Sequence, residues 1–88
     1  MHFSDALKRI KLGERLFRKG WNGANQFIFM VEGSEFEVNR KPLLGIYPRG
    51  TTIKYGPHID IKTVDGTVIP WICSQGDMFA DDWAITQS

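Results

Sequence analysis

The chain has little of the chemistry on which secreted proteins and membrane proteins depend. Its 88 residues include one cysteine, Cys73, so no internal disulfide can form and a reducing compartment is expected. No apolar run approaches the ~18 residues that a membrane span needs, and residues 1–5 lack the apolar region of a signal peptide. We therefore expect a soluble, cytoplasmic protein that does not enter a membrane.

Motifs of catalysis and metal binding are also missing. His2 and His58 are the only histidines, and there is no Cys-x-x-Cys, His-Glu-x-x-His or phosphate-cradling Gly-x-x-x-x-Gly-Lys-Ser/Thr pattern. The lone Cys73 is more typical of a small core residue than of a nucleophile. Four aspartates could supply a carboxylate pair for acid–base chemistry, but turns and helix caps explain them better: Asp60, Asp77, Asp81 and Asp82. We expect no enzyme activity, no metal and no cofactor.

The net charge of +1 hides an uneven distribution. Residues 1–20 hold six basic residues against two acids, whereas residues 63–88 hold four acids and no lysine or arginine. The two ends of the chain can meet within one subunit or between subunits, or the basic residues can simply form a solvated helix face. A pI near 7.9 does not indicate a nucleic-acid polymer as partner.

The order of the expected elements predicts an α+β fold in one domain, residues 1–88. Apolar residues at helical spacing predict a short helix capped by Ser4 and ended by Gly13. Such a helix must pack on a small antiparallel sheet of about five strands. A core of this size gives marginal stability, which oligomerisation would relieve.

Several apolar or alternating runs predict the strands of this sheet, and the run 27–31 is expected at its centre. The segment 39–57 is rich in proline and glycine, which predicts a long loop with a short strand near 51–53. A helical turn capped by Ser74 is expected late in the chain. The remaining strands are predicted at 16–18, 35–38, 59–64, 67–72 and 83–86.

The segment 59–72 is the most informative part of the chain because it predicts a β-hairpin. Asp-Gly at positions 65–66, between two β-branched runs, favours a two-residue turn. That turn pairs Asp60 with Trp71 and so places Trp71 beside Asp60 and Lys62, opposite the core. A large indole among polar residues indicates a binding surface or a subunit interface, while a slip of one residue would reverse the faces. The core face is expected to hold Ile59, Ile61, Val68 and Ile72.

A first group of candidate ligand-binding residues surrounds Trp21. An exposed indole can stack on a flat ring such as a purine. Arg18 can bind phosphate oxygens with two parallel hydrogen bonds, and Lys19 can bind them as a point charge. The side chain of Asn22 can contact base edges or ribose hydroxyls.

A second group follows Trp71. The backbone amides of Ser74 and Gln75, at the start of the predicted helical turn, can receive phosphate oxygens, and the side chain of Gln75 can contact base edges. The alternative is that Trp21 and Trp71 only close a small core, because tryptophan is usually well buried. Trp83 lies in an apolar run and is assigned to the core.

The order of several motifs resembles a known family. The motifs are Phe3-x-x-Ala6-Leu7, Arg18-Lys19-Gly20-Trp21-Asn22-Gly23, Pro57-His58-Ile59-Asp60, Asp65-Gly66-Thr67-Val68-Ile69-Pro70-Trp71, Ser74-Gln75-Gly76-Asp77-Met78 and Asp81-Asp82-Trp83. Together they resemble the small phage and bacterial family once called domain of unknown function 2829, whose studied members are Thoeris anti-defence proteins of the second type. The resemblance covers residues 3–31 and 55–86, and residues 33–54 match nothing in it.

The resemblance implies a sponge that binds cyclic ADP-ribose isomers without cleaving them, and so blocks the effector of a bacterial TIR-based defence in the cytoplasm of the infected host. Some relatives are also linked to cyclic oligonucleotides such as cyclic dinucleotides. It further implies a homotetramer with ligand pockets between subunits. Carried onto this sequence, the family pattern makes Trp21 and Trp71 stacking residues, with polar contacts from Asn22, Ser74, Gln75 and Asp77; the phosphate role of Arg18 and Lys19 is our inference.

Two other functions stay open at this point. One is a nucleotide hydrolase or transferase that uses the carboxylate of Asp77 or Asp60. The other is a protein-interaction or oligomerisation module in which Trp21 and Trp71 hold subunits together.

Overall fold

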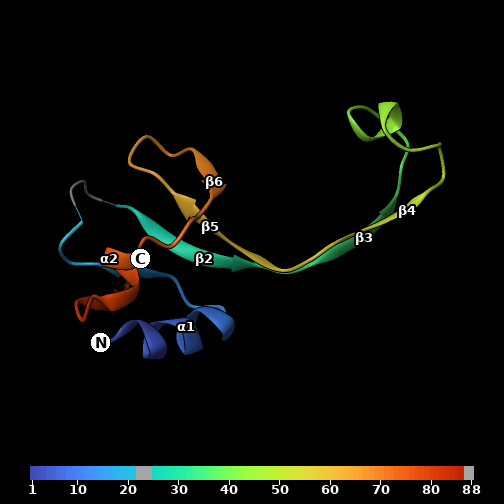
Figure 1. Cartoon of the computed structure of the whole chain (residues 1–88). Helices are drawn as coiled ribbons and strands as arrows, with labels where there is room; N and C mark the ends of the chain where they lie inside the picture. The colour runs from blue at the N-terminus through green and yellow to red at the C-terminus, as the bar shows by residue number, and fades with distance from the viewer. Residues whose placement is uncertain (22–24, 87–88) are drawn as a thin grey trace.

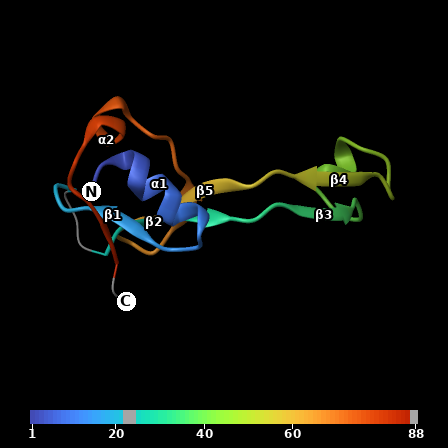
Figure 2. The same cartoon turned by 90° about the horizontal axis from the view of Figure 1, so that it is seen from below.

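The fold is α+β, as predicted, with a short N-terminal helix packed on an antiparallel sheet (Figures 1 and 2). The computed structural model describes residues 1–21 and 25–86. Five strands form the main sheet in the order β6-β5-β2-β1-β7, and a separate two-stranded sheet pairs β3 with β4. The elements are α1 (Phe3–Lys11), β1 (Leu16–Arg18), β2 (Phe27–Val31), β3 (Ser34–Glu37), the 3-10 helix η1 (Leu43–Gly45), β4 (Thr52–Tyr55), β5 (His58–Lys62), β6 (Val68–Pro70), α2 (Gln75–Phe79) and β7 (Trp83–Ile85).

Helix α1 begins two residues earlier than the sequence predicts. Its N-cap is His2, whose side chain makes no capping bond, so the assignment of Ser4 as N-cap is wrong. The N-terminus is held instead by β7, because the amino group of Met1 donates to the carbonyl oxygen of Trp83 at 2.7 Å. The predicted end is confirmed: Gly13 has a φ of +93°, and its N–H donates to the oxygen of Ile10 at 2.9 Å.

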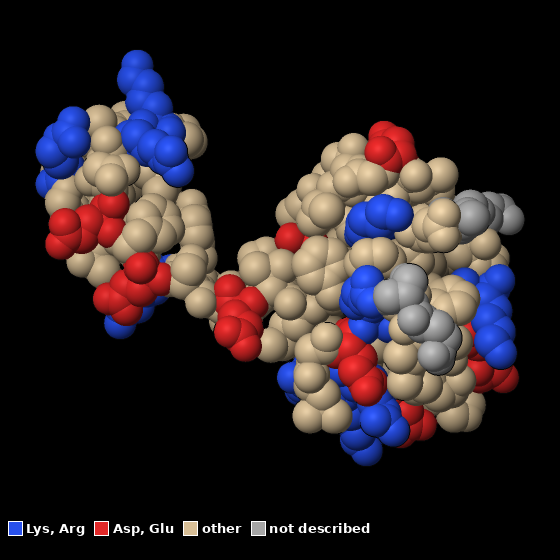
Figure 3. Space-filling model, turned by 180° about the vertical axis from the view of Figure 1, so that it is seen from behind, with Lys and Arg blue, Asp and Glu red and all other residues tan. Residues whose placement is uncertain are grey.

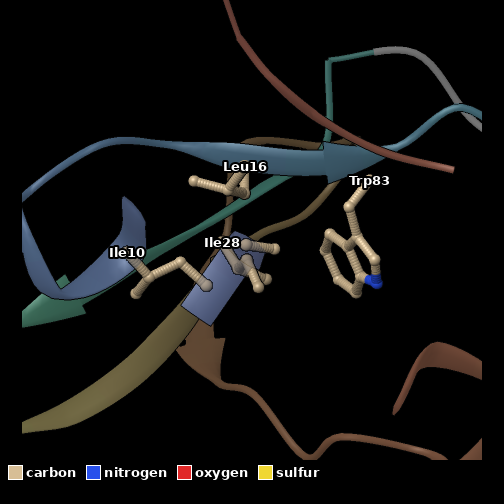
Figure 4. Packing of buried hydrophobic residues seen from close by; sticks show 5 residues of the cluster. Ile10, Leu16, Ile28 and Trp83 are labelled. Atoms are coloured by element: carbon tan, nitrogen blue, oxygen red, sulfur yellow. The ribbon is translucent and has the colours of Figure 1, made fainter. Parts of the chain in front are cut away.

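The core lies between α1 and one face of the main sheet. Figure 4 shows Ile10 of α1 beside Leu16 of β1, Ile28 of β2 and Trp83 of β7, and all four are fully buried together with Ala6. Strand β2 runs through the middle of the sheet, as its continuous apolar sequence predicts. The assignment of Trp83 to the core is confirmed.

The hairpin of β5 and β6 forms, but its predicted register is wrong by one residue. Asp60 pairs with Pro70 and Ile61 with Ile69, and the N–H of Trp71 donates to the oxygen of Ile59 at 2.9 Å. The turn contains one residue more than expected, since the N–H of Thr63 donates to the oxygen of Thr67 across three intervening residues. The slip turns Trp71 toward the core and leaves two residues predicted for the core exposed, Val68 and Ile72.

Residues 32–57 form an arm that projects from the body of the molecule (Figures 1 and 2). The strands predicted at 35–38 and near 51–53 form within it, and the segment predicted as a long loop, 39–57, is therefore one side of this arm and its tip. Its strands β3 and β4 pair from Ser34 with Tyr55 to Glu37 with Thr52, and the tip between them contains η1. In the space-filling view the arm is a lobe joined to the body by a narrow neck (Figure 3). None of the described helices is long and apolar enough to cross a membrane.

Candidate functional site

Four aromatic side chains meet where α1, β7 and the segment before α2 come together. We call them the indole cluster: Trp83 at the centre, with Trp21, Trp71 and Phe3 against it. The ring centroids of Trp21 and Trp71 lie 5.3 and 6.0 Å from that of Trp83, both edge-on, and Phe3 lies 5.3 Å from Trp83. Edge-to-face packing at these distances is the favoured arrangement of aromatic pairs.

Trp21 and Trp71 were interpreted either as exposed stacking rings or as rings that close a small core, and the structure agrees with each interpretation in part. Trp21 and Trp71 are half-buried and pack against the core, so neither ring stands free of the interior. The prediction that Trp71 lies on the face opposite the core is wrong, because the hairpin register differs by one residue. Each ring nevertheless keeps an exposed part at the surface, beside exposed Lys19 and exposed Ser74 respectively along the chain.

Asp77 connects the indole cluster to charged groups. Its Oδ1 accepts a hydrogen bond from Trp21 Nε1 at 3.1 Å and one from Arg18 Nη1 at 2.8 Å, while its backbone oxygen accepts from Trp83 Nε1 at 2.9 Å. Burial opposes ionisation of Asp77, but the hydrogen bonds from Arg18, Trp21 and Ser74 outweigh it, so the pKa of Asp77 lies below its usual range. Asp77 thus holds two indoles and one guanidinium in fixed positions.

Arg18 lies between two carboxylates. Its Nε donates to Asp82 Oδ1 at 2.8 Å, in addition to the bond from Nη1 to Asp77. Hydrogen bonds to Asp82 and Asp77 raise the pKa of Arg18 above its usual range, and the bonds from Arg18 and from the N–H of Gly20 lower the pKa of Asp82. The basic start and the acidic end of the chain therefore meet within one subunit, one of the two arrangements that the charge distribution allowed.

Helix α2 places the polar residues that follow Trp71. Ser74 is its N-cap, as predicted, and Ser74 Oγ accepts from the N–H of Asp77 at 3.0 Å. Gln75 is exposed at the first helical position. Because α2 has five residues, its dipole is weak, and the phosphate-binding role of these amides stays a prediction. Lys19 is exposed beside the site, and Asn22 lies outside the described residues.

The structure adds three residues to the site that the sequence did not assign to it. Asp82 fixes Arg18 and the turn at Gly20, while Phe3 and Trp83 support the two candidate stacking rings. The run Asp81-Asp82-Trp83 was a signal for two of them, but a pairing across 64 positions cannot be read from sequence.

Other groups with possible chemistry lie apart from the indole cluster or are poorly suited to it. Burial and the nearby Asp77 raise the pKa of the Cys73 thiol, which disfavours the reactive thiolate. His58 Nε2 lies 3.3 Å from Asp60 Oδ1 at the root of the arm. Over residues 1–21 and 25–86, no group of three or more His, Cys, Asp or Glu is arranged to hold a metal ion.

Comparison with known proteins agrees with the motifs that the site contains. The family model described as "Tad2-like: Thoeris anti-defense 2-like domain" matches residues 1–86. The chain is 35% identical over 85 residues to a protein of Bacillus phage SP01 named "Thoeris anti-defense 2", and the match covers 97% of this chain and 93% of the relative. The segments that meet at the indole cluster all lie within the matched region. The chain therefore belongs to the Tad2-like family of Thoeris anti-defense proteins.

Proposed function

We propose that this protein is a sponge, which binds cyclic ADP-ribose-type signalling nucleotides without cleaving them and so prevents activation of the Thoeris effector. Family membership and the name of the phage relative support an anti-defence role. The observation that carries the proposal is the indole cluster, in which Trp21 and Trp71 are half-buried and held edge-on against Trp83. Base stacking on such a ring contributes about 1–3 kcal/mol.

The ionisation state of the neighbouring groups supports binding rather than chemistry. Asp77 and Asp82 both bind Arg18, and the pKa of each carboxyl is lowered, so both are anionic at neutral pH and already engaged. A general acid or base works best with a pKa near the operating pH. The raised pKa of Cys73 likewise disfavours a nucleophile. A sponge needs none of these functions.

The proposed binding unit is a homotetramer with ligand pockets between subunits, acting in the cytoplasm of the infected host. One subunit of 88 residues encloses little of a ligand as large as a dinucleotide. A sponge must also bind its messenger more tightly than the effector does. We expect a dissociation constant around nanomolar, about 12 kcal/mol of binding free energy.

The decisive experiment asks whether the ligand survives binding. The full-length protein is incubated with a cyclic ADP-ribose isomer, freed of unbound ligand by desalting, and then denatured, and the released nucleotide is identified by mass spectrometry. Recovery of the intact cyclic isomer in stoichiometric amount supports the sponge. A linear product would identify a hydrolase instead, and no retained nucleotide from a panel of cyclic ADP-ribose isomers and cyclic dinucleotides would overturn the proposal.

A pair of lysine variants tests the position of the ligand. Lys19 lies beside the indole cluster, whereas Lys8 lies on the exposed side of α1, and both side chains are exposed. Calorimetry should show that Lys19→Ala weakens messenger binding about two- to fivefold, as expected for one exposed charge pair, with a smaller effect at high salt. Lys8→Ala should bind like the wild type. Equal affinities of all three proteins would show that phosphate groups do not approach Lys19.

A further inference from the structure

The arm lacks the contacts that an independent structure needs. Within residues 32–57, all of which the structure describes, Val38 alone is buried. An isolated two-stranded hairpin is at best marginally stable in water. The arm also extends the molecule to 46 Å along one axis against 26 Å along the others, and the Cα radius of gyration is 16.0 Å, whereas a compact domain of this length has about 12 Å. One protomer thus leaves a structured but unsupported projection.

Among the exposed apolar side chains of the described residues, two groups lie far apart in the molecule. At the arm tip, Ile46 is 70% exposed and Tyr47 41%. Around α2, Ile72 is 87% exposed, Phe79 80% and Met78 48%. We call the second group the α2 patch. Single exposed apolar side chains are common, whereas groups of them that lie together can mark an interaction surface.

The charges at these two places are opposite. Residues 38–57 carry four basic residues and no acid, and Figure 3 shows lysine and arginine side chains gathered at the end of the arm. Three acids lie in or next to α2, Asp77, Asp81 and Asp82; Arg18 pairs with Asp77 and Asp82, which leaves this group with a net negative charge. Complementary charge around matching apolar groups favours contact between the two surfaces and disfavours contact of each with itself.

We propose that the arm tip of one copy of this protein docks on the α2 patch of a second copy. The arm tip and α2 lie at opposite ends of the long axis in both ribbon views (Figures 1 and 2), so the contact cannot form within one chain. Two chains side by side and antiparallel bring each arm tip to the other's α2. The contact is then made twice around a two-fold axis and closes the dimer.

Docking also completes the site, a consequence that rests on the proposed function. Within a protomer, Arg18 is held by Asp77 and Asp82, so Lys19 is the exposed cation beside the indole cluster that can still contact a phosphate group. The partner's arm would bring basic side chains, among them Arg40 and Lys41, next to α2 and the indole cluster. The ligand would then lie between indoles of one subunit and cations of the other.

The test measures the mass of the full-length protein in solution, without ligand, by light scattering and sedimentation. The wild type should form a dimer or a multiple of it at micromolar concentration. Phe79→Lys and the double variant Arg40→Glu with Lys41→Glu should each reduce the assembled mass at least twofold, because each places like charges opposite one another. Leu12→Lys is the matched control, since Leu12 is 75% exposed at the end of α1, outside both surfaces, and should keep the wild-type mass.

Mixing the two defective variants gives the sharpest outcome. In a mixed dimer, one contact is wild-type on both sides, and in the other the introduced lysine faces the introduced glutamates. The mixture should therefore recover the wild-type mass, with both chains present by native mass spectrometry. Because Phe79 is largely exposed, circular dichroism should show all variants folded. A monomeric wild type, unchanged masses of both variants, or a mixture that fails to assemble would overturn the proposal.

Ligand binding separates this proposal from the sponge. A monomeric protein that retains the cyclic nucleotide would refute docking but support the sponge. A dimer that retains no cyclic nucleotide would support docking but refute the sponge. If docking completes the site, the arm double variant should bind a cyclic ADP-ribose isomer at least about tenfold more weakly than the wild type. Wild-type affinity in that variant would refute the contribution of the arm to the pocket.

Discussion

Replacing Asp77 by asparagine tests whether this residue holds the site together. The change keeps the shape of the side chain and removes its charge. Asp77 Oδ1 accepts bonds from Arg18 Nη1 at 2.8 Å and Trp21 Nε1 at 3.1 Å, and the carboxylate and guanidinium side chains are 14% and 23% exposed. A hydrogen bond to a charged group contributes about 1.5–3 kcal/mol. Arg18 keeps its bond to Asp82 and is not left unpaired, so we expect a loss of about 2 kcal/mol.

The loss is measured by urea unfolding at one fixed protein concentration, because assembly would make apparent stability depend on concentration. In a thermal scan it corresponds to a decrease in Tm of about 8–16 °C for a domain of this size. Asp82→Asn is the matched control: it removes the other carboxylate on Arg18 but no contact to an indole. Both variants should be less stable, and Asp77→Asn alone should change the fluorescence of the tryptophans.

The pH dependence supplies an independent check. The pKa of Asp77 is lower in the folded protein than its unfolded value of ~3.9. The contribution of Asp77 to the free energy of unfolding is therefore complete above the unfolded pKa and is lost as the pH falls through the folded pKa. The difference in unfolding free energy between wild type and Asp77→Asn should therefore be largest at neutral pH and shrink below about pH 4. A difference that stays constant from pH 7 to pH 3, or no difference at pH 7, would refute this account.

Two further substitutions test the root of the arm and the second indole. A Cβ at Gly33 would lie 2.7 Å from the backbone oxygen of Tyr55, whereas one at Gly56 meets nothing within 4 Å. In urea unfolding, Gly33→Ala should lower the free energy of unfolding by about 1–3 kcal/mol and Gly56→Ala should change it very little. Equal effects of the two substitutions would contradict the close packing at Gly33. Trp71→Leu should weaken binding of a cyclic ADP-ribose isomer at least about fivefold by calorimetry without changing the assembled mass, and a lower mass with unchanged affinity would instead identify Trp71 as a subunit contact.

Local patterns predicted the elements well where the physical cause is local. The continuous apolar run gave the central strand β2, Gly13 gave the end of α1, and Ser74 gave the cap of α2. The predicted register of the β5–β6 hairpin was wrong for a definable reason. Asp-Gly suits turns of two or three intervening residues, and a difference of one residue exchanges the two faces of the second strand. The position of Trp71 followed that error.

The arm and the charged network could not be predicted for a different reason. The strands at 35–38 and near 51–53 were predicted, but their pairing into one hairpin was not, because the prolines and glycines between them favoured a loop and β3 has no buried face to reveal its partner. The uneven charge distribution indicated that the ends of the chain can meet. Only the fold selects Arg18, Asp77 and Asp82 from the available charges, because the pairing depends on where β1, α2 and β7 come together.

The half-buried state of the tryptophans favours the function we propose. A sponge performs no chemistry, so its effect depends on affinity and on its own concentration. Ordering a mobile side chain on binding costs about 0.5–1.5 kcal/mol, and rings already fixed by Trp83 and Asp77 avoid that cost. Fully exposed indoles would offer more surface but would have to be ordered by each ligand. The packing of Trp71 against the core would thus give the proposed sponge a rigid stacking surface, while the exposed side chains of Gln75 and Lys19 could adapt to the ligand.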